Sequence, residues 1–337
     1  MSSELRFPKN FYFGAATSAH QVEGGNHNDW TEWEHANSAR LAAEAARRHA
    51  NGKTRGAFFR KKIAPSPPTR IPDYILKNYP HPLQEENYIL GKACDHYNRF
   101  QEDFDLAKEI GLNAYRFSVE WSRIEPEEGK FNQKEVEHYR KVIRACRERG
   151  IEPFVTLWHW TLPAWVAKQG GWESKKTIFY FSRFGEKIAT EFRKDVKFWI
   201  ILNEPGLWAA DAYLFGFKPP ARKNFWKLIR VYFNLTRAQK KTYRRLKNLN
   251  SSFEVGISEG MEYTDIPVFS HLRNYFFISR IKNSFDFLGI NYYRRRRFFG
   301  SSENISDMGW EIYPRGLHYF LKKSWRLFKK PIFITEN

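Results

Sequence analysis

The sequence predicts an α/β protein built as a (β/α)8 barrel, and three observations support this fold class. Short apolar runs recur along the chain, amphipathic stretches with helical spacing separate them, and polar residues of unusual kinds stand where the runs end. Alternation of strand and helix repeated this often is typical of a parallel sheet closed on itself and surrounded by helices. The 337 residues are also enough for one large barrel.

Each predicted strand is a short, nearly continuous apolar run, which is the pattern of strands buried on both faces of a parallel sheet. Seven such runs occur, at residues 11–17, 113–121, 152–160, 197–205, 254–259, 286–293 and 331–337. The seventh run ends at the last residue. We therefore expect the eighth β/α unit of the TIM barrel to be missing from this chain, and the chain to be a C-terminally truncated fragment.

Two of the intervening stretches show helical periodicity most clearly. In residues 97–110 and 132–149, apolar side chains recur every three or four positions, which indicates helices with one buried face. Gly111 and Gly150 follow these stretches directly, at the position where a glycine commonly ends a helix.

One segment, residues 36–92, interrupts the alternation. It holds an Ala-rich helical piece (LAAEAARRHA), a basic loop (GKTRGAFFRKK) and a Pro-rich stretch (PSPPTRIP). We interpret it as a long insertion after the first strand, and loops of this length are either functional or mobile. Residues 1–337 are otherwise expected to form a single, incomplete barrel domain.

Charge and cysteine content narrow the possible functions. The net charge of +19 is compatible with a nucleic-acid partner, but no nucleic-acid motif accompanies it. We therefore favour the interpretation that the charges are spread over solvated helix faces and a basic insertion, and we expect no nucleic-acid partner. Cys94 and Cys146 match no metal or redox spacing, and we expect no metal and no cofactor. No signal peptide and no membrane span are visible, so a cytoplasmic location with no membrane partner is expected. The oligomeric state stays open.

Polar residues gather at the ends of the predicted strands, where active sites lie in barrels of this kind. The fourth run ends in Asn203 and Glu204, the seventh ends in Glu336, and the second carries Arg116. Glycoside hydrolysis uses two carboxyl groups on either side of the scissile bond, one protonated and one ionised. An arginine such as Arg116 would favour the ionised form of the attacking carboxylate.

The sequence resembles glycoside hydrolase family 1, the β-glucosidase and β-galactosidase family. The resemblance rests on FPKNFYFGAATSAHQVEGG, CDHYNRFQEDFDLAKEIGLNAYRFSVEWSRIEP, TLWHWTLPAW, FWIILNEP, LGINYY, MGWEIYPRGL and PIFITEN. It implies a retaining β-glycosidase that removes terminal β-linked glucose- or galactose-type residues by double displacement through a covalent glycosyl-enzyme. The implied partner is a small β-glycoside or oligosaccharide.

The resemblance also implies the catalytic roles. Glu204 in NEP corresponds to the acid/base, and Glu336 in TEN corresponds to the nucleophile. Tyr293 is similar to the phenol that hydrogen-bonds the nucleophile, with Asn291 and Arg116 nearby.

Further residues are implied to bind the substrate. Gln21, His159 and Trp160 would contact the non-reducing sugar, and Asn203 would hold its 2-hydroxyl group. Trp310 in MGWEIYP would be the platform for the leaving group. For His159, Trp160 and Trp310, ordinary packing in the protein remains an alternative to substrate binding. For Arg116, the alternative is a purely structural role.

Two departures from the family pattern matter. The family continues past ITEN with residues that read the 4- and 6-hydroxyl groups, so glucose, galactose and 6-phospho-sugars are not distinguished by this chain. The basic run Arg294–Arg297 follows Tyr293; a solvated charge run is favoured over attraction of acidic substrates. A non-catalytic sugar-binding barrel or an inactive fragment remains the alternative function.

Overall fold

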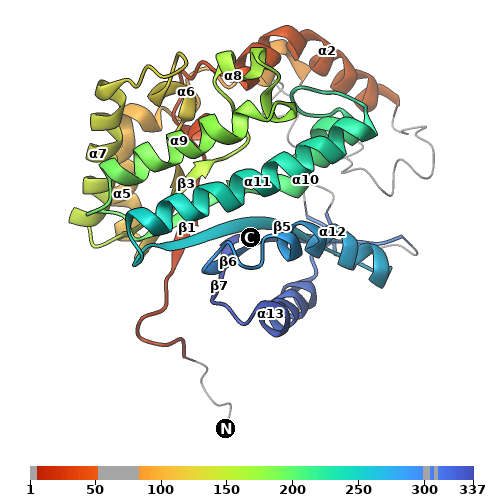
Figure 1. Ribbon diagram of the computed structural model, residues 1–337. Coiled ribbons are helices and arrows are strands. Elements are labelled where there is room, and N and C mark those ends of the chain that lie inside the picture. The colour runs from red at the N-terminus through yellow and green to blue at the C-terminus, as the bar shows by residue number, and fades with distance from the viewer. Residues whose placement is uncertain (1–5, 52–82, 299–303, 307–309) are drawn as a thin grey trace.

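The computed structural model describes residues 6–51, 83–298, 304–306 and 310–337. Seven parallel strands form one sheet in the order β1 to β7 (Figure 1). The strands are β1 (Gly14–Ala16), β2 (Ala114–Ser118), β3 (Glu152–Trp158), β4 (Phe198–Asn203), β5 (Glu254–Thr264), β6 (Phe287–Arg296) and β7 (Ile332–Glu336). All seven predicted strands are confirmed, although β5 and β6 continue beyond their apolar runs.

Helices connect the strands and lie against the outside of the sheet (Figure 1). The two predicted helices are confirmed as α5 and α7, and Gly111 and Gly150 after them have φ of 84° and 71°. The α-helices are α1 (Ala19–Val22), α2 (Asp29–Asn51), α5 (His96–Glu109), α6 (Trp121–Ile124), α7 (Gln133–Glu148), α8 (Ala164–Lys168), α9 (Lys176–Glu191), α10 (Pro205–Ala210), α11 (Phe225–Leu249), α12 (Pro267–Arg280) and α13 (Pro314–Phe328). Short helical turns are η2 (Glu85–Tyr88), η3 (Gly171–Glu173) and η4 (Asp211–Phe215).

Aromatic side chains fill the barrel interior toward the amino ends of the strands. The rings of Phe154 and Phe198, on neighbouring strands, stack with centroids 4.2 Å apart, and Phe287 and Phe333 close the group edge-on. Gly256 makes room for this packing, because a Cβ there would lie 2.3 Å from the Phe287 ring. A filled interior leaves the carboxyl ends of the strands as the place for a site.

The two edges of the sheet are β1 and β7. Within the described residues, backbone pairing joins each strand only to its neighbours in the order given, so β1 and β7 are not paired with each other. Phe13 beside β1 and Ile334 on β7 are 46% and 47% exposed. The described chain thus contains seven strands of a nearly closed barrel.

The expected insertion at 36–92 is described only in part, because residues 52–82 lie outside the described residues. Its Ala-rich piece is the second half of α2, which begins at Asp29 and so before the predicted boundary. Ser38 on α2 donates a 2.6 Å hydrogen bond to Glu85 of η2, and the carboxylate of Glu34 accepts one from the backbone of Leu90. These contacts tie both ends of the segment to each other.

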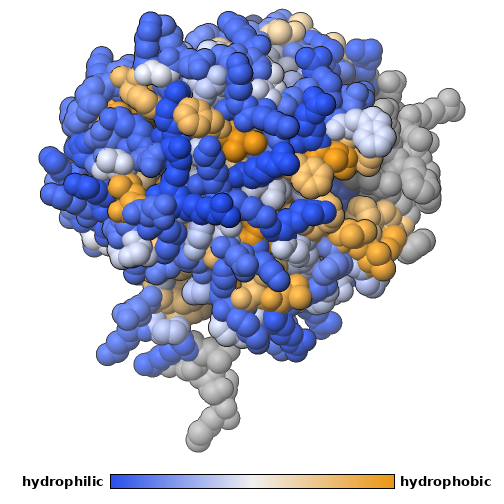
Figure 2. Space-filling view, in the orientation of Figure 1, coloured by the Kyte–Doolittle hydropathy of each residue, from blue (hydrophilic) through white to orange (hydrophobic). Residues whose placement is uncertain are grey.

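The surface carries many charged side chains. Figure 2 shows hydrophilic residues over most of the face in view, with scattered apolar patches. Within the described ranges, no helix is both long and apolar enough to cross a membrane.

Candidate active site

Arg116 on β2 joins three strands at the carboxyl end of the barrel. Its guanidinium group donates to Glu336 Oε1 at 2.7 Å and to Asn203 Oδ1 at 2.6 Å, and its Nε donates to Thr156 Oγ1 at 3.1 Å. The side chain is almost fully buried. Arg116 therefore links the ends of β4 and β7 and lies beside Glu336.

Glu204 stands between β4 and α10, where the strand turns sharply into the helix. Its φ and ψ of 45° and 48° are left-handed, an uncommon conformation for a residue with a side chain. Such conformations are costly and occur mainly where the surrounding structure needs them. Gly260 on β5 gives the carboxyl group its space, because a Cβ at that position would lie 2.6 Å from Glu204 Oε1.

The Glu204 carboxyl group is buried, and its pKa is raised to about 7. Burial is the largest cause, and the negative charge of Glu336 is the second. The cations of Lys218 and Arg116 and the hydrogen bond from Asn291 act in the opposite direction. Glu204 can therefore hold a proton near neutral pH.

A buried amide network connects the two glutamates. Asn291 Nδ2 lies 3.1 Å from Glu204 Oε1 and 3.2 Å from Asn203 Oδ1, so it can donate to both. Asn291 Oδ1 accepts from the hydroxyls of Ser258 and Thr335, each at 2.7 Å. These two hydroxyls orient the amide so that its NH2 group points to the glutamate, a role that the sequence analysis missed.

Glu336 receives two hydrogen bonds, one on each carboxylate oxygen. Arg116 donates to Oε1, and the hydroxyl of Tyr293 donates to Oε2. Burial and the nearby negative charge of Glu336 raise the pKa of Tyr293 above its usual value, so Tyr293 stays a protonated donor. Both partners favour an ionised carboxylate.

His159 and Trp160 follow β3 and contact β4. His159 Nε2 lies 3.1 Å from Asn203 Nδ2, and Trp160 Nε1 donates to the Asn203 backbone oxygen at 3.0 Å. Burial and the charge of Arg116 lower the pKa of His159 well below its usual value, so its ring is neutral. Trp160 also stacks against Trp30 at the start of α2, another residue that was not predicted.

The other two predicted residues lie farther out. Gln21 on α1 is exposed and accepts a hydrogen bond from Ser18 Oγ at 2.6 Å; no hydrogen bond between described residues connects it to either glutamate. The Trp310 ring lies 5.8 Å from that of Tyr293. Trp310 is therefore next to the group that contacts Glu336.

Lys218, on the loop after η4, is a further unpredicted neighbour. Its ammonium group lies 3.5 Å from the centre of the Trp160 ring and 3.0 Å from Asp211 Oδ2. Its charge lowers the pKa of both Glu204 and His159, which places it within electrostatic reach of the site. A single lysine in a loop carries no sequence signal that would have identified it.

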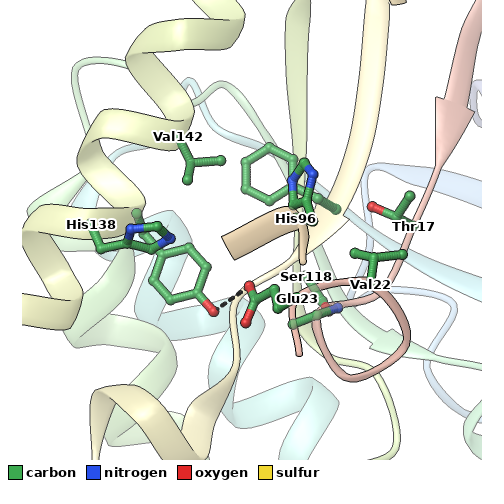
Figure 3. A pocket seen from close by; sticks show the side chains of 10 residues that line it. Thr17, Val22, Glu23, His96, Ser118, His138 and Val142 are labelled. Atoms are coloured by element: carbon green, nitrogen blue, oxygen red, sulfur yellow. Dashed lines mark hydrogen bonds between the residues drawn. The ribbon is translucent and has the colours of Figure 1, made fainter. Parts of the chain in front are cut away.

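A small pocket lies apart from these residues, between α1, β2, α5 and α7 (Figure 3). Glu23 faces Tyr139 there and accepts its hydroxyl at 2.7 Å, and Arg123 donates to the other carboxylate oxygen at 3.0 Å. None of the predicted site residues lines this pocket. Over the described part of the chain, no group of three His, Cys, Asp or Glu residues could hold a metal ion.

Replacing Arg116 by lysine should lower kcat/KM about 10²-fold, because small misplacements of reacting groups cost about this much. Lysine keeps the charge but loses the planar fork that binds Glu336 and Asn203 together. Initial rates with an aryl β-glucoside measure the effect. Arg149→Lys is the matched control, since Arg149 pairs with Asp105 elsewhere. Equal rates for both variants would contradict the role assigned to Arg116.

The parallel barrel and the paired strand-end glutamates are those of a TIM-barrel glycosyl hydrolase. A model of "Glycosyl hydrolase family 1" matches residues 72–275, and the chain belongs to this family.

Relatives and solved structures agree with this assignment. The chain is 31% identical over 299 residues to "Beta-glucosidase A" of Thermotoga maritima, covering 73% of this chain and 67% of that protein. It is 32% identical over 254 residues to a "6-phospho-beta-galactosidase" of Staphylococcus epidermidis, covering 75% and 45%. The structure superposes on a "beta-glycosidase from Pyrococcus horikoshii" with a TM-score of 0.78 and 30% identity, covering 99% of this chain and 76% of that one.

Proposed function

We propose that this protein is a retaining β-glycosidase in which Glu204 is the acid/base and Glu336 is the nucleophile. The observation that carries the proposal is the contrast between the two glutamates. Glu204 is buried with a pKa raised to about 7, whereas Glu336 is held by the Arg116 guanidinium and the Tyr293 hydroxyl. One carboxyl group is suited to donate a proton and the other to attack.

In the first step, Glu336 attacks the anomeric carbon while protonated Glu204 donates its proton to the glycosidic oxygen. The bond to the leaving group breaks, and a covalent glycosyl-enzyme forms on Glu336. In the second step, Glu204, now ionised, takes a proton from water, and the water oxygen displaces Glu336 from the anomeric carbon. Two inversions give net retention.

The amide network supports the sugar during these steps. Asn203 is held by Arg116 and Asn291 and lies next to His159, so its side chain is fixed before substrate arrives. We assign its NH2 group to the 2-hydroxyl of the sugar, a contact that strengthens in the transition state. The sugar class is a β-linked glucose- or galactose-type residue, with His159, Trp160 and Gln21 as further contacts and Trp310 as the leaving-group platform.

Hydrolysis of an aryl β-glucoside and an aryl β-galactoside tests the proposal directly. Turnover of either glycoside supports the proposed glycosidase activity. The alternative, a sugar-binding barrel without catalysis, predicts binding of the sugar in calorimetry with no release of the aryl group, and that result would overturn the proposed activity.

The pH dependence should follow the proton on Glu204. Because its pKa is raised to about 7, Glu204 is protonated below that pH and loses its proton as the pH rises through it. With a poor leaving group, kcat/KM should therefore fall above about pH 7. Lys218 lowers this pKa, so Lys218→Met should move the fall to higher pH.

Rates of the unaltered protein and of Lys218→Met, measured from about pH 5 to about pH 9, check the Lys218 prediction. This range lies on both sides of the pKa of a tuned carboxylic acid. Lys227→Met is the control, since Lys227 pairs with Glu173 instead. If kcat/KM of Lys218→Met falls at the same pH as in the unaltered protein, or at a lower pH, the charge effect assigned to Lys218 is contradicted.

A further inference from the structure

The outer sides of α11 and α12 carry exposed apolar side chains in two rows. On α12, Val268, Leu272 and Phe276 follow one another at intervals of four residues. On α11, Trp226 and Phe233 are seven residues apart. Residues at these spacings lie on one side of a helix, and all five side chains are between 41% and 79% exposed. Other residues of α12 are buried in the core, so this helix is apolar on two sides.

Arg280, the last residue of α12, joins the two rows into one surface. Its guanidinium carbon lies 4.2 Å from the centre of the Phe276 ring and 5.5 Å from that of Phe233. Both helices lie toward the viewer in Figure 1, and Figure 2 shows apolar residues over them among hydrophilic ones. We call this surface the α11–α12 face, and its residues are Trp226, Phe233, Val268, Leu272, Phe276 and Arg280.

The unpaired edges of the sheet do not explain why this face is exposed. α11 follows β4 and α12 follows β5, in the middle of the strand order, whereas the edges belong to β1 and β7. A strand placed beside β1 or β7 would therefore not cover the α11–α12 face.

The charges around the α11–α12 face have one sign. α11 holds eight lysines and arginines in 25 residues and no aspartate or glutamate, and α12 holds two arginines and no acidic residue. Four of these cations form ion pairs with acids on other elements. Within the described part of the chain, no ion pair engages the other six, which are Arg230, Arg237, Lys240, Lys241, Arg244 and Arg280.

The basic run Arg294–Arg297, for which the sequence favours solvated charges, is arranged differently. The structure corrects that expectation, because these four side chains are between 11% and 34% exposed and each pairs with Glu262 or Glu311. The arginines of β6 are thus bound to acids of the protein itself. The six cations of α11 and α12 form no such pair among the described residues.

Exposed apolar rows among cations match the chemistry of an anionic bilayer surface. The boundary between head groups and acyl chains accepts aromatic and aliphatic side chains, while lysines and arginines attract anionic head groups. Trp226 is the most exposed large apolar side chain among the described residues, and tryptophan is enriched at this depth of a membrane. A nucleic acid would contact the cations but would leave Val268 and Leu272 without an apolar partner.

We propose that the α11–α12 face docks on anionic lipid bilayers. Trp226, Val268 and Leu272 enter the boundary region, and the unpaired cations contact the head groups. Binding of this kind needs no membrane-spanning helix, so it goes beyond the expectation of no membrane partner, which considered only spanning segments. The proposal is independent of the proposed glycosidase activity, because no residue assigned to that site belongs to the α11–α12 face.

Flotation of the protein with lipid vesicles gives the first test. We expect vesicles of phosphatidylcholine and phosphatidylglycerol to bind the protein at least about tenfold more tightly than phosphatidylcholine alone, since each lysine or arginine near an anionic surface strengthens binding about fivefold. This preference should shrink as salt is raised, because salt screens exposed charges.

A matched pair of leucine variants tests the place of contact. Leu272→Ser should weaken binding to the mixed vesicles about tenfold, because burial of a leucine side chain contributes at least roughly this much. Leu106→Ser is the control and should bind like the unaltered protein. The two leucines are 56% and 59% exposed, but Leu106 lies on α5, which carries four acidic residues. Both side chains are on the surface, so neither substitution opens the core.

Three results would overturn the proposal. The first is no binding to the mixed vesicles at low salt, and the second is equal binding to vesicles with and without phosphatidylglycerol. The third is an equal loss in Leu272→Ser and Leu106→Ser, which would place the contact elsewhere. Binding of duplex DNA that Leu272→Ser leaves unchanged, together with no vesicle binding, would show a general polyanion surface instead of a membrane-docking one.

Discussion

Replacing Glu336 by alanine should abolish turnover of aryl β-glycosides, with a loss of about 10⁶-fold, the order seen when a catalytic nucleophile is removed. Without the carboxylate, no glycosyl-enzyme can form. Azide fits the space left by the side chain and can attack the anomeric carbon from the same face. Added azide should therefore restore turnover and give the α-glycosyl azide, which NMR identifies.

Glu102→Ala is the control for this experiment, since Glu102 lies exposed on α5 and pairs only with Arg99 among the ion pairs of the described residues. It should keep the activity of the unaltered protein. A Glu336→Ala variant that retains activity, or that yields only β-glycosyl azide, would show that another group attacks.

Replacing Glu204 by alanine should separate substrates by their leaving groups. A glycoside with a poor leaving group needs a proton in the first step and should slow by about 10²–10⁴-fold, the usual contribution of a general acid. A 2,4-dinitrophenyl glycoside needs no proton, so formation of its glycosyl-enzyme should proceed nearly normally. Steady-state and burst kinetics on both substrates measure this difference.

The control for Glu204→Ala is Glu127→Ala, because Glu127 is exposed and pairs with Lys130. Azide added to Glu204→Ala should give the β-glycosyl azide, since it attacks the intermediate on Glu336. Equal losses on both substrates, with no azide product, would remove Glu204 from the acid role.

The strands could be predicted because a parallel barrel leaves a strong pattern in the sequence. Strands buried on both faces need continuous apolar runs, so the seven runs and the polar residues at their ends were both visible. β6 was predicted too short, because its last residues are arginines. They form ion pairs with Glu262 on β5 and with Glu311, which lie outside the predicted strand run and could not be paired with it from the sequence.

The site could be predicted only in part for a similar reason. Asn203 ends β4, whereas Arg116 lies within β2 and Asn291 within β6, and the structure joins the three by direct hydrogen bonds. Ser258 and Thr335 orient Asn291, but small hydroxyl residues inside strands look like ordinary strand residues. Their importance appears only when β5, β6 and β7 are placed side by side.

The most direct test of the central claim is the anomer that forms first when the protein hydrolyses an aryl β-glucoside, followed by proton NMR before mutarotation. Retention through Glu336 predicts β-glucose as the first product and a carboxyl separation between Glu204 and Glu336 of about 5–5.5 Å. First formation of α-glucose would show a single displacement by water and would contradict the assignment of Glu336 as a nucleophile.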